Sequence, residues 1–500
     1  MALRLNNIRR VLPLITLTAC AMDQAPPNWP QYRGPNGTGL AAETDNPPSE
    51  FGPSKHVLWK TAIPSGHSSP SIGGDRIFLS AFDKSSQKLE VLAVDRKNGK
   101  ILWRRDVPAK EFEEIHSLNS LATATPVVDG ERVYTYFGSY GIVCFDFDGS
   151  LKWSVPLPVA HIVPHGSSAS LLLAGDRVIL NRDEVPDTYL LAVDRHTGKT
   201  IWKQRQNMGP PEKRNGGKAT PVLWKDEIIL HRRGEIVGYD VTTGARKWWV
   251  RVETQGAGTP VASADAIYVG TWFNGGEPDL RVPFPDFDTL LKQSDKNGDG
   301  VLDAQEFPER VDIAKRVGLE GVEGADTSRP GRSVFQAADK DKDGKLTRAE
   351  WEEYTANSNT TASEHGLLAI QPGGQGDVTT SRVLWKETRA VPEVPTPLYY
   401  KSRVYTVTNG GIVSCMDAAT GKVMFRGRLG ADGAYFASPI EASGRLYFTS
   451  GEGSITVINA GDKLDILAKN EFEEQLFATP AVIGNVIYVR TPTFLYAFAN

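Results

Sequence analysis

The sequence predicts an all-β protein: an eight-bladed β-propeller of four-stranded blades, closed by the N-terminal strand, with a helical insertion in blade five. Three observations support this fold class. A unit of strand, Asp, Gly turn and Trp recurs along the 500 residues, a Ser/Thr-Pro pair marks another strand in each copy, and one copy is divided between the chain ends. Units that cannot bury their own apolar face stack on copies of themselves.

The repeated unit begins with a short apolar strand and an Asp. A turn ending in Gly follows, and an aromatic residue stands eight positions after the Asp in the clearest copies, 92–103 (LAVDRKNGKILW) and 191–202 (LAVDRHTGKTIW). Other copies, some of them weaker, lie at 144–153, 237–248, 367–385, 414–425 and 457–467.

The second marker is a Ser or Thr followed by Pro, placed where a short strand starts and no ladder donor is lost. Each pair precedes a turn and a strand such as DRIFLS or ERVYTY, which gives four strands per unit, A to D. The pairs begin at Ser69, Thr125, Thr220, Thr259, Thr396, Ser438 and Thr479, and Ser170-Leu171 holds the remaining place.

The chain ends supply the two halves of one blade. A lone Trp strand at 57–60 has no strand before it, and the strand at 494–500 ends before its Trp. Pairing them closes the ring and removes free sheet edges. Residues 56–283 and 358–500 then form the propeller, with about 46 residues per blade, within the roughly 40 to 50 of propeller repeats.

The N-terminus is predicted to be an export signal. Arg4, Arg9 and Arg10 precede an apolar run, 11–19, which is too short to span a bilayer and ends in Leu-Thr-Ala before Cys20. The pattern resembles bacterial lipoprotein signals, which implies a signal at 1–20, lipidation of Cys20 and an outer-membrane lipoprotein facing the periplasm. An ordinary secretory signal is the alternative. A tether and leader are expected over 21–55.

Charge and cysteine content narrow the partners. The net charge of -4 and the pI near 6.1 give no basic footprint, so nucleic acid is not an expected partner. Cys144 and Cys415 fall on the third strands of blades two and six, which are opposite in a ring of eight. A disulfide requires Cα atoms within about 7 Å, so both are expected to be buried thiols.

Two acidic loops occupy an insertion at 284–357, between the B strand of blade five at 265–270 and its C strand at 367–370. DKNGDGVLDAQE (295–306) and DKDKDGKLTRAE (339–350) match the EF-hand loop, with Gly at position 6 and Glu at position 12. The predicted metal ligands are Asp295, Asn297, Asp299, Val301, Asp303 and Glu306 in the first loop, and Asp339, Asp341, Asp343, Lys345, Thr347 and Glu350 in the second.

Helices are expected before and after both loops, over 287–294, 307–317, 333–338 and 347–354. Two bound Ca²⁺ ions are expected, because flexible oxygen ligands suit Ca²⁺ better than Mg²⁺. A fixed structural clip is favoured over a calcium switch. B–C loops emerge on the same face of a propeller as D–A loops, so the pair should overhang the face where ligands usually bind.

The repeat A-x-D-x-x-T-G-x-x-x-W resembles the pyrroloquinoline-quinone-like propeller superfamily, and WPQYRGPNGTG (29–39) resembles the leader of its bacterial secreted members. The resemblance implies eight blades with Trp residues docked between them: Trp59, Trp103, Trp153, Trp202, Trp248 and Trp385. One branch consists of quinone-dependent dehydrogenases with calcium, an Asp base and often an adjacent Cys pair. The other consists of non-catalytic lipoproteins similar to the propeller subunit of the outer-membrane β-barrel assembly machinery.

The sequence lacks adjacent cysteines and a haem-attachment motif, so it favours the lipoprotein branch, although the EF-hand pair departs from it. We therefore expect a scaffold that binds envelope proteins through the face with the B–C and D–A loops. A quinone-dependent dehydrogenase, or another enzyme with a site in the funnel, is the alternative. Its candidate residues lie near D–A loops: His67, His116, His165, Lys218 and Tyr435.

Overall fold

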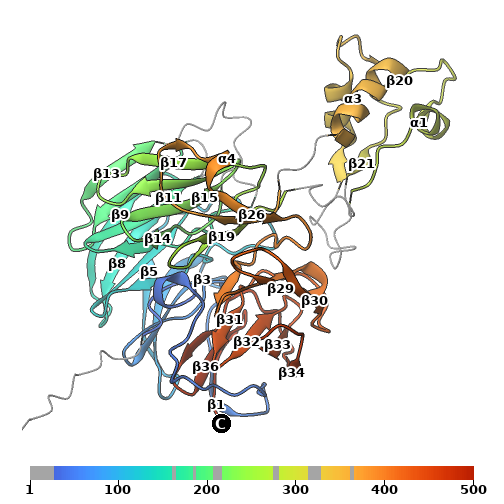
Figure 1. The fold of residues 1–500 in the computed structure, drawn as a ribbon. Helices are drawn as coiled ribbons and strands as arrows, with labels where there is room; N and C mark the ends of the chain where they lie inside the picture. Colours follow the sequence, from blue (N-terminus) through green and yellow to red (C-terminus); the bar gives the residue numbers. More distant parts are fainter. Residues whose placement is uncertain are drawn as a thin grey trace, which may run out of the picture.

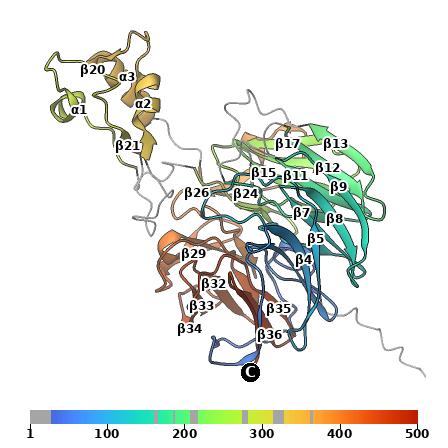
Figure 2. The same ribbon diagram turned by 180° about the vertical axis from the view of Figure 1, so that it is seen from behind.

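The computed structural model describes residues 28–159, 165–183, 187–205, 217–273, 281–313, 328–360 and 365–500. The signal at 1–20 and Cys20 lie outside the described residues. Eight antiparallel sheets form a closed ring, which confirms the predicted propeller (Figures 1 and 2). The A strands of neighbouring blades contact one another, so strand A is the innermost and strand D the outermost.

The blades have the following strands in the order A to D. Blade one has β2 (Ser71–Gly73), β3 (Arg76–Asp83), β4 (Lys88–Asp95) and β5 (Ile101–Val107); blade two has β6 (Val127–Val128), β7 (Arg132–Phe137), β8 (Gly141–Asp146) and β9 (Leu151–Pro156); blade three has β10 (Leu172–Ala174), β11 (Arg177–Arg182), β12 (Tyr189–Asp194) and β13 (Thr200–Arg205). Blade four has β14 (Val222–Trp224), β15 (Glu227–Arg232), β16 (Glu235–Asp240) and β17 (Arg246–Arg251); blade five has β18 (Val261–Ala262), β19 (Ile267–Gly270), β24 (Leu367–Ile370) and β26 (Val383–Glu387). Blade six has β27 (Leu398–Tyr400), β28 (Arg403–Thr408), β29 (Ile412–Asp417) and β30 (Val423–Arg428); blade seven has β31 (Ile440–Ala442), β32 (Arg445–Thr449), β33 (Ser454–Asn459) and β34 (Ile466–Glu471).

Blade eight closes the ring. Its first three strands come from the C-terminus, β35 (Ala481–Ile483), β36 (Val486–Arg490) and β37 (Phe494–Phe498), and its D strand is the N-terminal β1 (Val57–Ala62). Trp59 of β1 pairs with Ala497 of β37 in an antiparallel register. The divided copy of the repeat is therefore one complete sheet, as the sequence predicts.

Blade four departs from the four-stranded pattern. A short strand, β25 (Gly376–Asp377), pairs in parallel with the outer strand β17, opposite Trp248 and Trp249. The segment comes from the long C–D connection of blade five and continues into helix α4 (Thr379–Arg382). It covers an edge that would otherwise present unpaired backbone groups to solvent.

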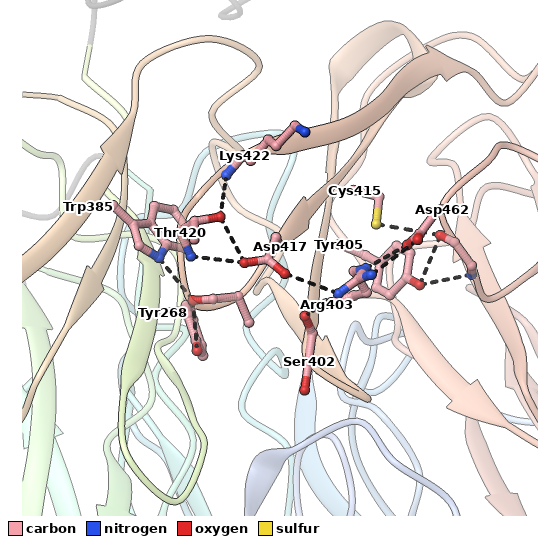
Figure 3. A network of polar contacts seen from close by, with 12 residues as sticks. Tyr268, Trp385, Ser402, Arg403, Tyr405, Cys415, Asp417, Thr420, Lys422 and Asp462 are labelled. Atoms are coloured by element: carbon pink, nitrogen blue, oxygen red, sulfur yellow. Dashed lines mark hydrogen bonds and ion pairs between the residues drawn. The ribbon is translucent and has the colours of Figure 1, made fainter.

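The Asp-Gly-Trp repeat joins neighbouring blades, as Figure 3 shows for blades five and six; Trp248 differs, because its indole donates to Glu227 in its own blade. Asp417 accepts hydrogen bonds from the backbone N–H (3.0 Å) and hydroxyl (2.8 Å) of Thr420, which holds the turn in shape. The indole of Trp385, in the preceding blade, donates to the Ala418 carbonyl at 2.9 Å and lies against Gly421. The same bond recurs from Trp59 to Arg96, from Trp103 to Phe147 and from Trp153 to Arg195.

Arg403 continues this junction towards blade seven. Its guanidinium lies 3.2 Å from Asp417 and 2.6 Å from Asp462, and the hydrogen bond from Arg403 lowers the pKa of Asp462 (Figure 3). The Cys415 thiol lies beside them, with Sγ 3.5 Å from the Gly461 carbonyl. Cys144 and Cys415 are both free and buried, which confirms that they form no disulfide.

A ring of hydroxyl groups surrounds the channel. At seven of the eight A strands, the preceding Ser or Thr accepts a hydrogen bond from the backbone N–H of its counterpart in a neighbouring blade, at 2.8 to 3.1 Å. The chain of bonds runs through Ser69, Thr125, Ser170, Thr220 and Thr259, and through Thr396, Ser438 and Thr479 back to Ser69. Within the described residues, the link from Thr259 to Thr396 is missing, and Thr396 Oγ1 is buried without a partner.

The leader enters the channel from the face that carries the A–B turns. Trp29 pairs with Ile72 of β2 and is 1% exposed, so no tether extends beyond residue 28. The Tyr32 hydroxyl reaches the Ser438 hydroxyl of the ring at 2.7 Å. Arg33, fully buried, donates to the carbonyl of Pro397 at 3.0 Å. The segment is therefore a plug, seated against the innermost strands as far as the hydroxyl ring.

The insertion leaves blade five between β19 and β24 and projects away from the propeller (Figures 1 and 2). It contains α1 (Phe287–Ser294), β20 (Leu302–Asp303), β21 (Arg310–Asp312), β22 (Ser328–Pro330), α2 (Gly331–Ala338), β23 (Lys345–Leu346) and α3 (Arg348–Thr360). Its base is tied by Thr271 to Gly366, and Trp272 accepts a bond from Gln255 of the preceding D–A loop. The insertion thus starts on the face with the D–A loops. No helix in the described part of the chain is long and apolar enough to cross a membrane.

Candidate functional site

The first acidic loop wraps around its own carboxylates. Carboxylate oxygens of Asp295, Asp299 and Glu306 all lie within 4.8 Å of one another. The Asp295 carboxylate accepts the N–H groups of Gly298 and Gly300, at 2.7 and 3.1 Å, which folds the loop back over position 1. The other predicted ligands, Asn297, Val301 and Asp303, lie in the same loop.

The second loop gathers Asp339, Asp341 and Asp343, whose oxygens also lie within 4.8 Å of one another. Burial alone would raise the pKa of Glu350, but hydrogen bonds from Thr347 and from the backbone of Lys340 outweigh it, so the pKa is lowered and the carboxylate is ionised. Lys345 and Thr347 complete the set of predicted ligands.

Asp339 provides a test of whether a cation fits. It is 7% exposed, and its Oδ1 is buried with no hydrogen-bond partner among the described residues. A buried carboxylate oxygen without a partner is costly unless a cation or donor reaches it. An oxygen-rich site of flexible loops suits Ca²⁺. The residues present therefore fit a calcium ion.

The two loops are held together by a small core. Leu302 and Leu346, both fully buried, pair across the two-stranded sheet of β20 and β23. Trp351 is 1% exposed, packs edge-on against Phe307 and Phe284, and donates from Nε1 to the Pro285 carbonyl at 2.9 Å. The apolar side chains of the two loops and their helices are therefore buried within the insertion itself.

The predicted helix over 307–317 is wrong where the structure describes it. Residues 310–312 form β21, which pairs with β22, and residues 314–317 lie outside the described part. The segment instead pairs with β22, from Arg310 to Asp312, and this pairing places Val311 in the core of the insertion. The predicted helices α1, α2 and α3 are present.

The residue two places before each ring hydroxyl, at the end of a D–A loop, is partly exposed. These residues are His67, Thr123, Ser168, Lys218, Ala257, Val394, Phe436 and Phe477. On one side, His67 stacks on Phe477 at 4.2 Å between ring centroids, and Phe477 contacts Phe436 at 5.4 Å. All three are partly exposed. Burial, and secondarily the charge of Arg490, lower the pKa of His67 to about 3, so it is neutral.

A second group lies across the loops of blades two to four. The rings of His116 and His165 are 5.1 Å apart, and Lys218 Nζ donates to the Gly166 carbonyl at 3.0 Å. The structure thus brings together three of the five candidate residues, while His67 stands apart with its aromatic neighbours. Tyr435 is structural: it is 1% exposed, and its hydroxyl donates to the Ala431 carbonyl at 2.8 Å.

Sequence reasoning missed several buried polar groups that shape this face. His231 bonds to the Gly258 carbonyl at 2.6 Å and to the Thr254 hydroxyl at 2.7 Å, and burial lowers its pKa to about 4. Arg490 is 1% exposed and donates to carbonyls including Ser80 at 2.9 Å. No motif marks these residues. Phe436 and Phe477 did have a signal, because each stands at a fixed place in the Ser/Thr-Pro repeat.

Residues 87–277 and 333–491 match the family described as outer membrane protein assembly factor BamB. The chain belongs to this family. Residues 287–310, which include the first acidic loop, match the EF hand family. A comparison with curated proteins gave no match.

Solved structures show which folds this BamB-family chain shares. BamB from Moraxella catarrhalis is 14% identical, with a TM-score of 0.50, over 89% of this chain and 97% of that one. A europium-containing methanol dehydrogenase is 10% identical, with a TM-score of 0.56, over 95% and 99%. Quinohemoprotein alcohol dehydrogenase from Comamonas testosteroni is 11% identical, with a TM-score of 0.52, over 95% and 80%. At these identities the likeness establishes the propeller fold alone.

Proposed function

We propose that this protein is an exported, lipid-anchored, calcium-binding scaffold of the bacterial cell envelope. It binds partner proteins through the face that carries the D–A and B–C loops. The observation that carries the proposal is the BamB family match over more than half of the chain. The likeness to dehydrogenases, by contrast, is one of fold.

The chemistry of the repeats supports a scaffold. The Asp, Gly and Trp of each unit are used for turns and blade contacts, as at Asp417, Gly421 and Trp385. The surface formed by Phe436, Phe477 and His67 is instead partly exposed and aromatic. Aromatic groups of this kind are enriched at the centres of protein interfaces.

Calcium has a structural role in this proposal. Two ions bind at 295–306 and 339–350 and clip the insertion in one shape. The apolar core around Trp351 is closed and buried, which suits a unit held in one shape. A clip in the periplasm needs only weak affinity, with Kd on the order of 10⁻⁴ to 10⁻³ M.

Site-specific photo-crosslinking in intact cells tests the scaffold role. A photoreactive phenylalanine analogue at Phe477, on the D–A face, is expected to give discrete adducts with envelope proteins. The matched control carries the analogue at Ala264, an exposed position in an A–B turn. Equal adducts from both positions, or none from Phe477, would contradict the proposed binding face.

The dehydrogenase alternative predicts a quinone in the funnel. Within the described residues, the clusters of three metal-binding side chains lie in the two acidic loops, and Cys144 and Cys415 lie on the buried strands β8 and β29 rather than in the D–A loops. These described residues therefore provide no support for the dehydrogenase alternative. Purified protein incubated with pyrroloquinoline quinone and Ca²⁺ tests this, and stoichiometric binding with dye reduction would refute the scaffold role.

A further inference from the structure

The leader leaves the propeller at one defined point. Asn28 Oδ1 accepts the Gly74 N–H in the A–B turn of blade one at 3.1 Å, and Trp29 and Ile72 exchange backbone hydrogen bonds of 3.0 and 2.7 Å. The Pro30 carbonyl accepts the Val128 N–H of blade two at 2.8 Å. The chain is therefore fixed beside the innermost strands, on the face with the A–B and C–D turns.

The fixed point limits how the propeller can turn above a membrane. Eight peptide steps separate Cys20 from Asn28, and at about 3.5 Å each they reach at most about 28 Å. To place the D–A face on the lipid, the chain would have to pass around the rim. Three strand spacings of about 4.8 Å and a strand length of about 20 Å make that path roughly 34 Å. The path is longer than the reach of the chain.

We propose that the seated leader restricts the orientation of the propeller on the membrane by keeping the D–A face off the lipid. The D–A loops, the B–C loops and the calcium-binding insertion then point away from the bilayer, and the face with the A–B and C–D turns lies nearer to it. This inference rests on the proposed lipid anchor at Cys20. It identifies the D–A face as the one that the bilayer leaves open to partners.

The surface charge of the face with the A–B and C–D turns does not by itself orient the propeller on the membrane. Some carboxylates in the A–B and C–D turns are paired: Asp75 with Lys97 at 2.9 Å, Asp176 with Arg195 at 3.2 Å, and Asp462 with Arg403 at 2.6 Å. Other charges in these turns are of both signs, such as Lys225 and Asp226, so the face has no large single-sign field to attract or repel anionic lipid strongly. The orientation should therefore depend on the length of the leader and not on salt concentration.

Two reporters on one blade test the orientation. Ser443 lies in the turn between β31 and β32, Glu452 in the turn between β32 and β33, and both are exposed. They stand at opposite ends of one strand, about 25 Å apart. Ser443→Cys and Glu452→Cys are labelled with a donor dye in the full lipidated protein, bound to vesicles with acceptor-labelled headgroups. The native Cys144 and Cys415 are buried and remain unlabelled.

Energy transfer is expected to be about twofold or more greater from position 443 than from position 452, and unchanged by salt. Inserting twenty Gly/Ser residues between Cys20 and Asn28 should remove most of the difference, because the longer chain passes the rim. Equal or reversed transfer in the membrane-bound protein would overturn the orientation while leaving the anchor intact. Failure of the protein to bind vesicles, with no difference from Cys20→Ala, would overturn both.

Discussion

The blade junction of Figure 3 predicts different costs for two matched glycine substitutions. Gly421 and Gly444 have nearly equal backbone angles, with φ of 73° and 75°, so placing Ala at either position costs the same, about 1–2 kcal/mol. A Cβ at Gly421 would lie 2.7 Å from Trp385 Cδ2, whereas a Cβ at Gly444 meets nothing within 4 Å. Overpacking a tight contact costs about 1–3 kcal/mol more.

The expected result is that Gly421→Ala lowers the free energy of unfolding by about 1–3 kcal/mol more than Gly444→Ala. Urea denaturation of the two variants and the parent, followed by circular dichroism, measures this difference directly. Because both positions have similar strain from positive φ, the difference between the two variants measures the contact with the indole of Trp385. Equal midpoints and slopes for both variants would refute the idea that the Gly of the repeat is required by the Trp of the preceding blade.

Three further predictions address calcium, the plug and pH. Glu306→Gln with Glu350→Gln should abolish calorimetric calcium binding, since it removes both position-12 carboxylates; retained binding would contradict the loop assignment. Arg33→Met leaves the carbonyls that Arg33 reaches unpaired, at about 1–3 kcal/mol each, and should expose the leader to limited proteolysis; an unchanged cleavage rate would argue against the plug. His231 is neutral when folded and has a pKa lowered to about 4 from 6.5, so the unfolded chain binds the proton first and stability falls as pH drops from 6.5 to 4, by up to about 3 kcal/mol. His231→Gln should reduce the loss of urea stability over that window without abolishing it, because burial also lowers the pKa values of His67 and His365; an unchanged pH profile would count against the role of His231.

The propeller was predictable because each repeat contains chemically distinct residues at fixed positions. An Asp that closes a turn, a Gly that lies against an indole and a Trp that docks on the next blade each leave a separate mark, as at Asp417, Gly421 and Trp385. The added strand β25 left no such mark. Its pairing with Trp248 and Trp249 uses backbone groups alone, and side-chain patterns do not report backbone pairing between distant segments.

The acidic loops were predictable for the same reason, since metal coordination requires oxygen atoms at fixed spacing. The segment after the first loop was not, because its apolar pattern fits a helix and its pairing with the distant residues 328–330 leaves no mark in the sequence. Its Val311 is 8% exposed and turns into the core from a strand. Among the residues of the D–A loops, His67 was a candidate from the sequence, but Phe436 and Phe477 were not. These two residues share its place in the repeat and form the aromatic surface around it.

Arg33 shows why the leader belongs to the fold. It is completely buried, and burial lowers its pKa to about 10, yet it has no carboxylate partner within salt-bridge distance in the described structure. A guanidinium in this position is stabilised by carbonyls on both sides, from its own segment at Gly37 and from the propeller at Pro397. A cation held only in this way requires the leader to be seated, because withdrawal would leave the inner carbonyls without donors. The same seat places the leader against the hydroxyl ring through Tyr32 and Ser438, so the leader holds the centre of the propeller on the face with the A–B turns.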